Sequence, residues 1–283
     1  MKLSEIPVSF YHQARLALKK PSQLQGKGKP RLPVIVSLTS IPSRLHALST
    51  TVRSLLCQDA LPEKIVLWLH HDLEETLPRS LASLQGDIFE IRYSPYTFSH
   101  RKLIHSLDAF PDRIIITCDD DLIYHPSALK MTYEQHLKHP DCVIGNRCRE
   151  ISYDAEGAVR SYLQWPFVKE AKVDPWLLMP VGAFLVLYPP GILDEEAKNV
   201  DLFTEIAPKS DDLWFKTCAL LKGKRSMAST NPPPEPIPVW GTQKVALKHV
   251  NNKMDFNRNQ WEAISKHFGF KLPRTEAKGP IRR

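Results

Sequence analysis

The chain has 283 residues, of which 42% are hydrophobic and 24% are charged. This is ordinary globular composition, so disorder, collagen and coiled coil are excluded as descriptions of the whole chain. The net charge is +7; residues 1–32 carry +6 and residues 271–283 carry +4, which leaves −3 for residues 33–270. A mildly acidic body with two basic tails argues against nucleic acid as a partner. The tails fit an anionic membrane surface, or they are merely solvated.

The cysteines and the hydropathy of the sequence limit where in the cell the protein is expected. Five cysteines are scattered without a Cys-x-x-Cys pair, so the sequence indicates neither a disulfide framework nor a zinc cluster. The simplest location for such a protein is a reducing cytoplasm. The first residues lack the apolar stretch of a signal peptide. The most apolar run, residues 177–188, is too short to span a bilayer. We expect a cytoplasmic protein, at most peripheral at the inner face of the plasma membrane.

From residue 32 to residue 118, short apolar runs alternate with segments of helical spacing. The first 32 residues predict at most a short amphipathic helix followed by a linker. Ser99 is the expected cap of a helix. We predict strands at residues 32–38, 64–69, 87–93 and 113–118, and helices at residues 43–58 and 100–110.

The second half of the chain is less regular. Residues 151–176 are rich in aromatic side chains without clear periodicity, and residues 231–236 read as a stiff proline-rich linker. We predict helices at residues 126–139, after Ser210 and at residues 260–267, and strands at residues 142–146 and 182–188. The alternation of strands and helices predicts an α/β sheet with right-handed crossovers.

Three adjacent carboxylates, Asp119, Asp120 and Asp121, end the strand predicted at residues 113–118. They repel one another, so this strand end needs solvent or a cation as compensation. Ligands of open α/β sheets bind at the carboxyl ends of strands. Alternation along an extended chain would turn Asp119 and Asp121 to one side, where their oxygens suit Mg²⁺ or Mn²⁺. Such a metal leaves positions for phosphate oxygens, which suggests a diphosphate substrate; the alternative is an acidic turn without chemistry.

Four short segments occur in the order typical of one enzyme family. They are residues 34–44 (VIVSLTSIPSR), residues 99–107 (SHRKLIHSL), the Asp-Asp-Asp strand end and Ser210-Asp211-Asp212. Over about residues 33–225 the chain resembles the metal-dependent nucleotide-sugar glycosyltransferases of the GT-A fold, in particular the family-2-like bacterial enzymes of surface-polysaccharide and lipopolysaccharide biosynthesis. The resemblance implies a GT-A-like (Rossmann-like) mixed, mostly parallel sheet flanked by helices. It also implies a nucleotide-sugar donor and a glycan or lipid-linked acceptor.

The expected organisation has three parts. Residues 1–32 form a basic extension and linker. Residues 33–230 form the catalytic domain, with a nucleotide-binding half at about 33–124 and an acceptor half at about 125–230. Residues 231–283 hold the proline-rich linker, a last helix and a basic tail.

The resemblance also implies contacts with the nucleotide. Thr39, Ser40 and Arg44 would meet the base and ribose; the alternative is a helix cap followed by a surface arginine. Lys102 would meet the nucleotide or its phosphates, although a solvated helix face would also contain such a lysine.

For the metal, the resemblance implies an Asp-x-Asp motif. Its first member, Asp119, approaches the ribose or the metal, and its last, Asp121, binds the metal; Asp120 belongs to the same nucleotide-sugar site. Mn²⁺ or Mg²⁺ is the expected cofactor. His249 is the best candidate for a late third ligand, as one histidine among eleven.

Inverting enzymes of this type carry an acidic pair at a helix start, whose second member is the general base. Here Asp211 and Asp212 match, with Asp in place of Glu, so either could take the proton. A serine followed by two acids is also a well-formed helix N-terminus. Trp240 could stack on a sugar as part of a lid, or anchor the core.

Two other functions compete with sugar transfer. A nucleotidyltransferase or phosphohydrolase could use Asp-Asp-Asp with Mg²⁺, although the chain has no Gly-x-x-x-x-Gly-Lys-Ser/Thr phosphate loop. A non-catalytic membrane-associated protein could keep the same fold. Such a protein would gain no thermal stability from nucleoside diphosphates.

Overall fold

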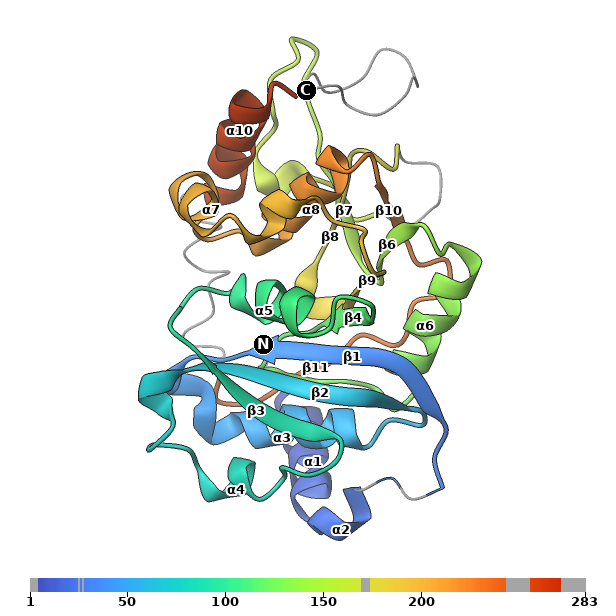
Figure 1. Cartoon of the computed structure of the whole chain (residues 1–283). Helices are drawn as coiled ribbons and strands as arrows, with labels where there is room; N and C mark the ends of the chain where they lie inside the picture. Colours follow the sequence, from blue (N-terminus) through green and yellow to red (C-terminus); the bar gives the residue numbers. More distant parts are fainter. Residues whose placement is uncertain (1–4, 25, 27, 169–173, 243–254, 271–283) are drawn as a thin grey trace.

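The computed structural model describes residues 5–24, 26, 28–168, 174–242 and 255–270 (Figure 1). Its centre is a seven-stranded sheet in the order β10-β6-β9-β4-β1-β2-β3, in which only β9 runs antiparallel to its neighbours. The strands are β1 (Arg31–Thr39), β2 (Leu61–His70), β3 (Phe89–Ser94), β4 (Ile114–Thr117), β6 (Cys142–Gly145), β9 (Val186–Tyr188) and β10 (Arg225–Ala228). The predicted mixed, mostly parallel α/β sheet flanked by helices is confirmed.

Helices cover both faces of the sheet, and alternating strand residues divide the core between them. In β4, Ile116 packs toward one helical layer and Ile115 toward the other, because successive side chains of a strand point to opposite faces. The first layer holds α3 (Leu45–Leu56), α4 (Arg79–Ala82) and α6 (Ala128–Lys138). The second holds α5 (Arg101–Ala109), α7 (Val200–Ile206), α8 (Asp211–Leu221) and α10 (Phe256–Phe268). In Figure 1 the second layer lies above the sheet, α3 and α4 lie below it, and α6 lies at its side.

Short elements complete the fold. Two-stranded sheets pair β5 (Leu122–Ile123) with β11 (Ile237–Pro238), and β7 (Cys148–Glu150) with β8 (Leu178–Pro180). Single turns of 3-10 helix span η2 (Pro42–Arg44), η3 (His71–Leu73), η4 (Tyr162–Gln164), η5 (Gly182–Phe184) and η6 (Glu195–Lys198), and α2 spans Pro21–Leu24. None of the helices in the described ranges is long and apolar enough to cross a membrane.

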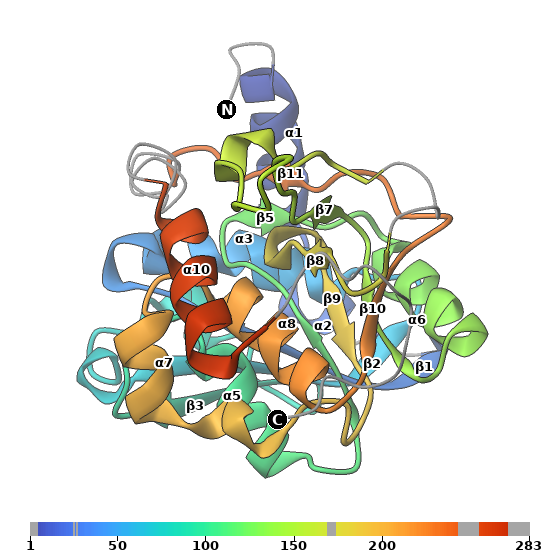
Figure 2. The same ribbon diagram turned by 90° about the horizontal axis from the view of Figure 1, so that it is seen from above.

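The N-terminal extension is packed against the fold. Its helix α1 (Ile6–Ala17) lies against α3 and beside β11 (Figure 2). The Ser9 hydroxyl donates to the carbonyl of Pro238 at 2.6 Å and accepts from the Trp240 N–H at 3.0 Å. Leu16 is buried with Val239 in a small apolar cluster. Since β11 pairs with β5 directly after the three aspartates, β11 and the helix α1 packed on it lie close to the acidic residues.

Two other segments differ from the prediction. Residues 182–184 form the turn η5, so the strand predicted at residues 182–188 is only β9. Side chains hold that turn: the Asn146 amide donates to the carbonyls of Phe184 and Leu185, and Leu185 has a left-handed φ of 65°. The last helix, α10, begins at Phe256, before the predicted start at residue 260, and buries Trp261 in the same core as α8.

Candidate active site

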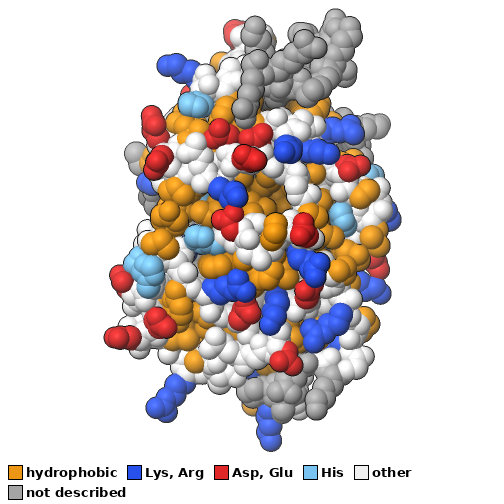
Figure 3. All heavy atoms as spheres, in the orientation of Figure 1, with side chains coloured by type: hydrophobic (Ala, Val, Ile, Leu, Met, Phe, Trp, Pro, Cys, Tyr) orange, Lys and Arg blue, Asp and Glu red, His pale blue; other side chains and the backbone are white. Residues whose placement is uncertain are grey.

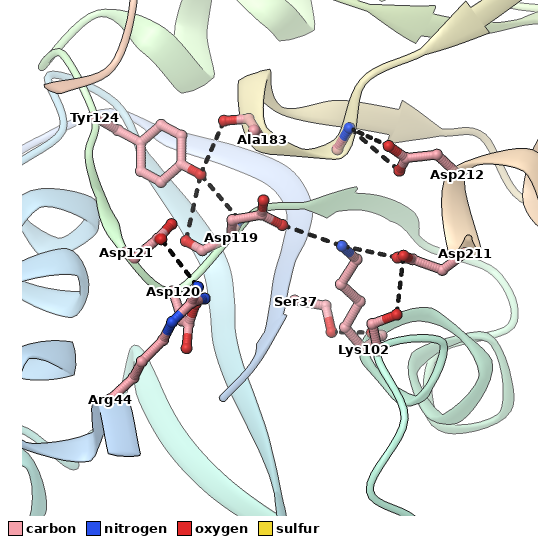
Figure 4. Close-up of polar contacts among 12 residues, drawn as sticks. Ser37, Arg44, Lys102, Asp119, Asp120, Asp121, Tyr124, Ala183, Asp211 and Asp212 are labelled. Atoms are coloured by element: carbon pink, nitrogen blue, oxygen red, sulfur yellow. Dashed lines mark hydrogen bonds and ion pairs between the residues drawn. The ribbon is translucent and has the colours of Figure 1, made fainter. Parts of the chain in front are cut away.

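The predicted site residues gather at the carboxyl edge of the sheet (Figure 4). Thr39 ends β1, the three aspartates follow β4, and Asp211 opens α8 from the helical layer above. Lys102 in α5 lies between the aspartates of the turn and those of α8. Parallel strands bring their carboxyl ends to one edge, so residues more than a hundred positions apart converge here.

The acidic turn, defined as Asp119–Asp121, is built around Arg44. Asp120 accepts hydrogen bonds from the Ser40 hydroxyl at 2.5 Å and from Arg44 at 2.6 Å, and Asp121 lies 3.3 Å from the same guanidinium. The carboxylate of Asp119 instead faces Lys102 (Figure 4). The expected pairing of Asp119 with Asp121 on one side is therefore wrong. Strand β4 ends at Thr117, and strand alternation does not extend into the turn.

The acidic turn carries more negative charge than its partners neutralise. Burial raises the pKa of Asp120, although Arg44 and Ser40 act in the opposite direction. Burial and the neighbouring Asp119 raise the pKa of Asp121 to about 6, against the opposing effect of Arg44. An additional cation would favour the ionised form of both groups.

The acidic turn could supply some, but not all, of the ligands of a hard divalent cation. The donors are carboxylate oxygens, which Mg²⁺ and Mn²⁺ prefer, and a bound cation would oppose the burial and the charge of Asp119 that raise the pKa of Asp121. Among the described residues, no group of three or more His, Cys, Asp or Glu side chains is arranged to hold a metal by itself. The acidic turn would supply one or two ligands, and substrate phosphates and water the others, which is the usual arrangement for Mg²⁺.

Lys102 connects the acidic turn with the start of α8. Its side chain is 6% exposed, and its ammonium lies 3.2 Å from Asp119 and 2.9 Å from Asp211. Burial acts to lower the pKa of Lys102, but the carboxylates of Asp211 and Asp119 outweigh it and hold the pKa well above its usual value. The alternative of a solvated helix lysine is wrong, because α5 turns this residue inward.

The two aspartates at the start of α8 have different surroundings. Burial would raise the pKa of Asp211, but Lys102 and His100 overcome this and hold it below its usual range. Burial and the charge of Asp211 raise the pKa of Asp212 to about 7, and Lys102 opposes that rise only in part. Both oxygens of Asp212 accept from the Gly182 N–H, at 3.2 and 3.1 Å. Asp212 is therefore the carboxylate that can accept a proton near neutral pH.

The hydroxyls at the end of β1 are already engaged within the protein. The Thr39 hydroxyl donates to the Trp68 carbonyl at 2.8 Å and accepts from Arg101, whose guanidinium also donates to the Ser40 carbonyl. Ser40 is buried and donates to Asp120. Contact of Thr39 and Ser40 with a nucleotide stays a prediction, and their visible role is to fix the edge beside the acidic turn.

Several residues at the site were not predicted from the sequence. Arg101 fixes the end of β1, and Gly182 leaves room for Asp212 and Lys102: a Cβ there would lie 2.7 Å from Asp212 and 3.3 Å from Lys102. The Tyr124 hydroxyl accepts from the Asp119 N–H at 2.9 Å and lies 3.3 Å from the Ala183 carbonyl. Ser99, expected as a helix cap, donates instead to Asp211 at 2.9 Å.

Two further candidates, His249 and Trp240, come from the C-terminal part of the chain. His249 falls in residues 243–254, outside the described ranges, so its role as a ligand stays a prediction. The Trp240 side chain is 54% exposed and does not anchor the core. Its role as a sugar-stacking lid stays a prediction. On the face drawn in Figure 3, Lys and Arg side chains are interspersed with Asp and Glu, without one continuous basic surface.

Comparisons with known proteins found only distant similarity. No protein-family model and no curated protein sequence matches the chain. Among solved structures, TarS 1–349 of S. aureus is 16% identical over 72% of this chain and 59% of that one, with a TM-score of 0.46. The 4-diphosphocytidyl-2C-methyl-D-erythritol synthase of Anaerococcus prevotii is 12% identical over 81% of this chain and 97% of that one, with a TM-score of 0.47. UDP-glucose pyrophosphorylase in complex with UDP-glucose is 11% identical over 85% and 99%, with a TM-score of 0.42. Similarity at this level assigns no activity.

Proposed function

We propose that this protein is an inverting, metal-dependent glycosyltransferase that moves a sugar from a nucleotide-sugar donor to a glycan or lipid-linked acceptor. One observation carries the proposal. Asp212, a carboxylate whose pKa is raised to about 7, lies in the same buried charge cluster as the acidic turn. A site for the charged leaving group and a general base for the incoming hydroxyl are therefore adjacent.

The acidic turn is the donor side of this site. Asp121 would hold Mn²⁺ or Mg²⁺, and Asp119 would join it by rotating its carboxylate away from Lys102; the bound ion would neutralise charge on the departing diphosphate. Arg44 fixes the carboxylates of Asp120 and Asp121 in the turn. The ion pair with Lys102 sets the direction of the Asp119 carboxylate.

Asp212 is the proposed general base. Its carboxylate takes the proton of an acceptor hydroxyl as that oxygen forms a bond to the anomeric carbon of the sugar. The bond from the anomeric carbon to the β-phosphate oxygen breaks in the same step, and the nucleoside diphosphate leaves with the electron pair. A single displacement of this kind inverts the anomeric centre.

Asp211 and Lys102 are positioning residues in this mechanism. The ion pair at 2.9 Å keeps Asp211 ionised. The negative charge of Asp211 in turn raises the pKa of Asp212 toward neutrality, where a general base is most effective. The Gly182 N–H holds Asp212 through both of its oxygens.

Nucleotide binding tests this function directly. We would measure thermal stability with UDP, GDP, CMP and dTDP, each with and without Mn²⁺, for the wild type and Asp121→Asn. We expect one nucleotide to stabilise the wild type only with the metal, and Asp121→Asn to lose the effect. Asp87→Asn, which removes an exposed carboxylate before β3, is the matched control. Stabilisation independent of Asp121, or pyrophosphate release without an acceptor, would favour a nucleotidyltransferase or phosphohydrolase.

We also propose that the protein contacts an anionic membrane surface through α1 while acting in surface-polysaccharide or lipopolysaccharide biosynthesis. The outward face of α1 is apolar: Phe10 and Tyr11 are each 62% exposed, and Leu18, just after the helix, is 83% exposed. Arg15, in the last turn of α1, and Lys19, just after the helix, border that face with positive charge on one side. An apolar face bordered by cations is the pattern of helices that lie in a membrane interface.

Vesicle sedimentation of the full chain checks the membrane contact. Phe10→Ser combined with Leu18→Ser should reduce binding to vesicles that contain phosphatidylglycerol. Leu137→Ser on α6, which removes another exposed apolar side chain, should not. Equal binding of all three proteins would refute a role for α1.

A further inference from the structure

A pocket lies at the same edge of the sheet as the candidate active site. It has a volume of about 340 Å³ and lies where β6 and β10 end, under the proline-rich residues 232–236. Tyr124 lines this pocket, and its hydroxyl also accepts the N–H of Asp119. The pocket therefore adjoins the acidic turn.

Arg147 is the cation of this pocket. Its guanidinium carbon lies 3.9 Å from the ring centre of Phe167 and 4.5 Å from that of Phe184, so two aromatic rings fix the plane of the group. Contact with an aromatic ring favours a cation and leaves the N–H groups at its edge available. A guanidinium oriented in this way matches the planar oxygens of a carboxylate or the oxygens of a phosphate.

The acidic partner of Arg147 is easily displaced. Glu235, from the proline-rich segment, lies 2.9 Å from the guanidinium, and its own side chain is 77% exposed. An ion pair with so exposed a carboxylate contributes little to stability. Arg149 differs: it stacks on Phe167 at 3.9 Å as well, but it donates to the backbone carbonyls of Trp165 and Tyr162. Of the two arginines, only Arg147 can exchange its partner without uncovering the backbone.

We propose that this pocket binds an anionic group of the acceptor, a carboxylate or a phosphate, on Arg147 in place of Glu235. The proposal rests on the proposed function, since it assigns the pocket to the acceptor. Glu235 and Arg147 are the charged residues among those that line the pocket, so displacing Glu235 leaves a net positive charge. The Asn146 side-chain oxygen and the Ser229 hydroxyl, which have no hydrogen-bond partner among the described residues, belong to residues of the same lining and suit the hydroxyls of a sugar ring.

Calorimetric titration without nucleotide or metal tests this pocket separately from the transferase reaction. The probes are methyl glucuronide, which carries a carboxylate, glucose 6-phosphate, which carries a phosphate, and methyl glucoside, which is neutral. The wild type should bind one charged probe and not the neutral one. Arg147→Gln should weaken that binding at least tenfold, whereas Arg79→Gln on α4 should leave it unchanged.

Glu235→Gln should change the affinity for the charged probe in the opposite direction. A gain in affinity cannot be explained by a variant that fails to fold. Because the substitution removes the competing carboxylate, it should tighten binding of the charged probe about 3- to 10-fold. The probe that responds identifies the group as carboxylate or phosphate. Equal affinity in wild type and Arg147→Gln, no gain in Glu235→Gln, or no binding by any protein would overturn the proposal. If the protein binds no nucleotide but the charged probe still responds to Arg147→Gln and Glu235→Gln as expected, only the proposed function is refuted.

Discussion

Replacing Lys102 with methionine tests the charge balance on which the site depends. Methionine fills a similar volume, but it leaves Asp211 buried without its cation, 2.9 Å from where the ammonium had been. Breaking a buried ion pair from one side costs about 3–5 kcal/mol. The Asp211 side chain is 14% exposed and the Asp119 side chain 36%, so most of this loss should come from Asp211.

The loss should depend on pH with a definite sign. In the wild type, Lys102 holds the pKa of Asp211 below its usual value, so Asp211 contributes stability above its unfolded pKa and loses it only as the pH falls toward about 2. In Lys102→Met, burial raises the pKa of Asp211 instead, and protonation relieves the unpaired charge. The free-energy loss should therefore be largest near pH 8 and smaller near pH 5.

Urea denaturation of both proteins at these two pH values is the assay, with the midpoint and the slope compared. Adding Asp211→Asn to Lys102→Met should recover part of the lost stability, since it removes the unpaired charge. A buried ion pair predicts a large loss in the free energy of unfolding that depends on pH. A loss below about 1 kcal/mol, or an equal loss at pH 5 and pH 8, would refute the reasoning.

Three further predictions follow from the same contacts. Activity should rise as the pH increases through the Asp212 pKa of about 7. Asp211→Asn removes a negative charge that raises this pKa, so it should move the rising part of the kcat/KM pH profile about one pH unit lower. A profile that does not move would contradict the assignment of Asp212 as the base. Gly182→Ala should cut kcat roughly 100-fold with little change in Tm, because its Cβ displaces the Asp212 carboxylate; full activity would show that this position tolerates the shift. Ser9→Ala should cost about 1–3 kcal/mol in urea, since it leaves the Pro238 carbonyl and the Trp240 N–H without their partner, and an unchanged midpoint would show that water replaces the hydroxyl.

The sheet was predictable where local patterns decide the structure. The β-branched runs that became β1 and β4 are buried on both faces, and such runs read clearly in a sequence. The sequence of residues 182–184 is equally compatible with a strand, but Asn146 donates a hydrogen bond to the Phe184 carbonyl and Asp212 accepts one from the Gly182 N–H, and these contacts hold a turn. Those partners are distant in sequence, so periodicity could not reveal them.

The candidate site was predictable in composition but not in contacts. The run of three aspartates and the acidic start of α8 are visible as local clusters. That Lys102 lies between them depends on which face of α5 turns inward, and Arg101, next to it, is engaged with β1 instead. Two adjacent basic residues give no local signal of which will contact the carboxylates.

Sugar transfer by Asp212→Asn tests the central claim most directly. We would measure transfer from the nucleotide sugar whose nucleotide stabilises the protein, and the affinity for that nucleotide, in the wild type and this variant. Loss of the general base should reduce transfer about 100- to 10,000-fold while nucleotide affinity stays within about twofold of the wild type. Transfer at the wild-type rate by Asp212→Asn would contradict Asp212 as the base and with it the proposed mechanism.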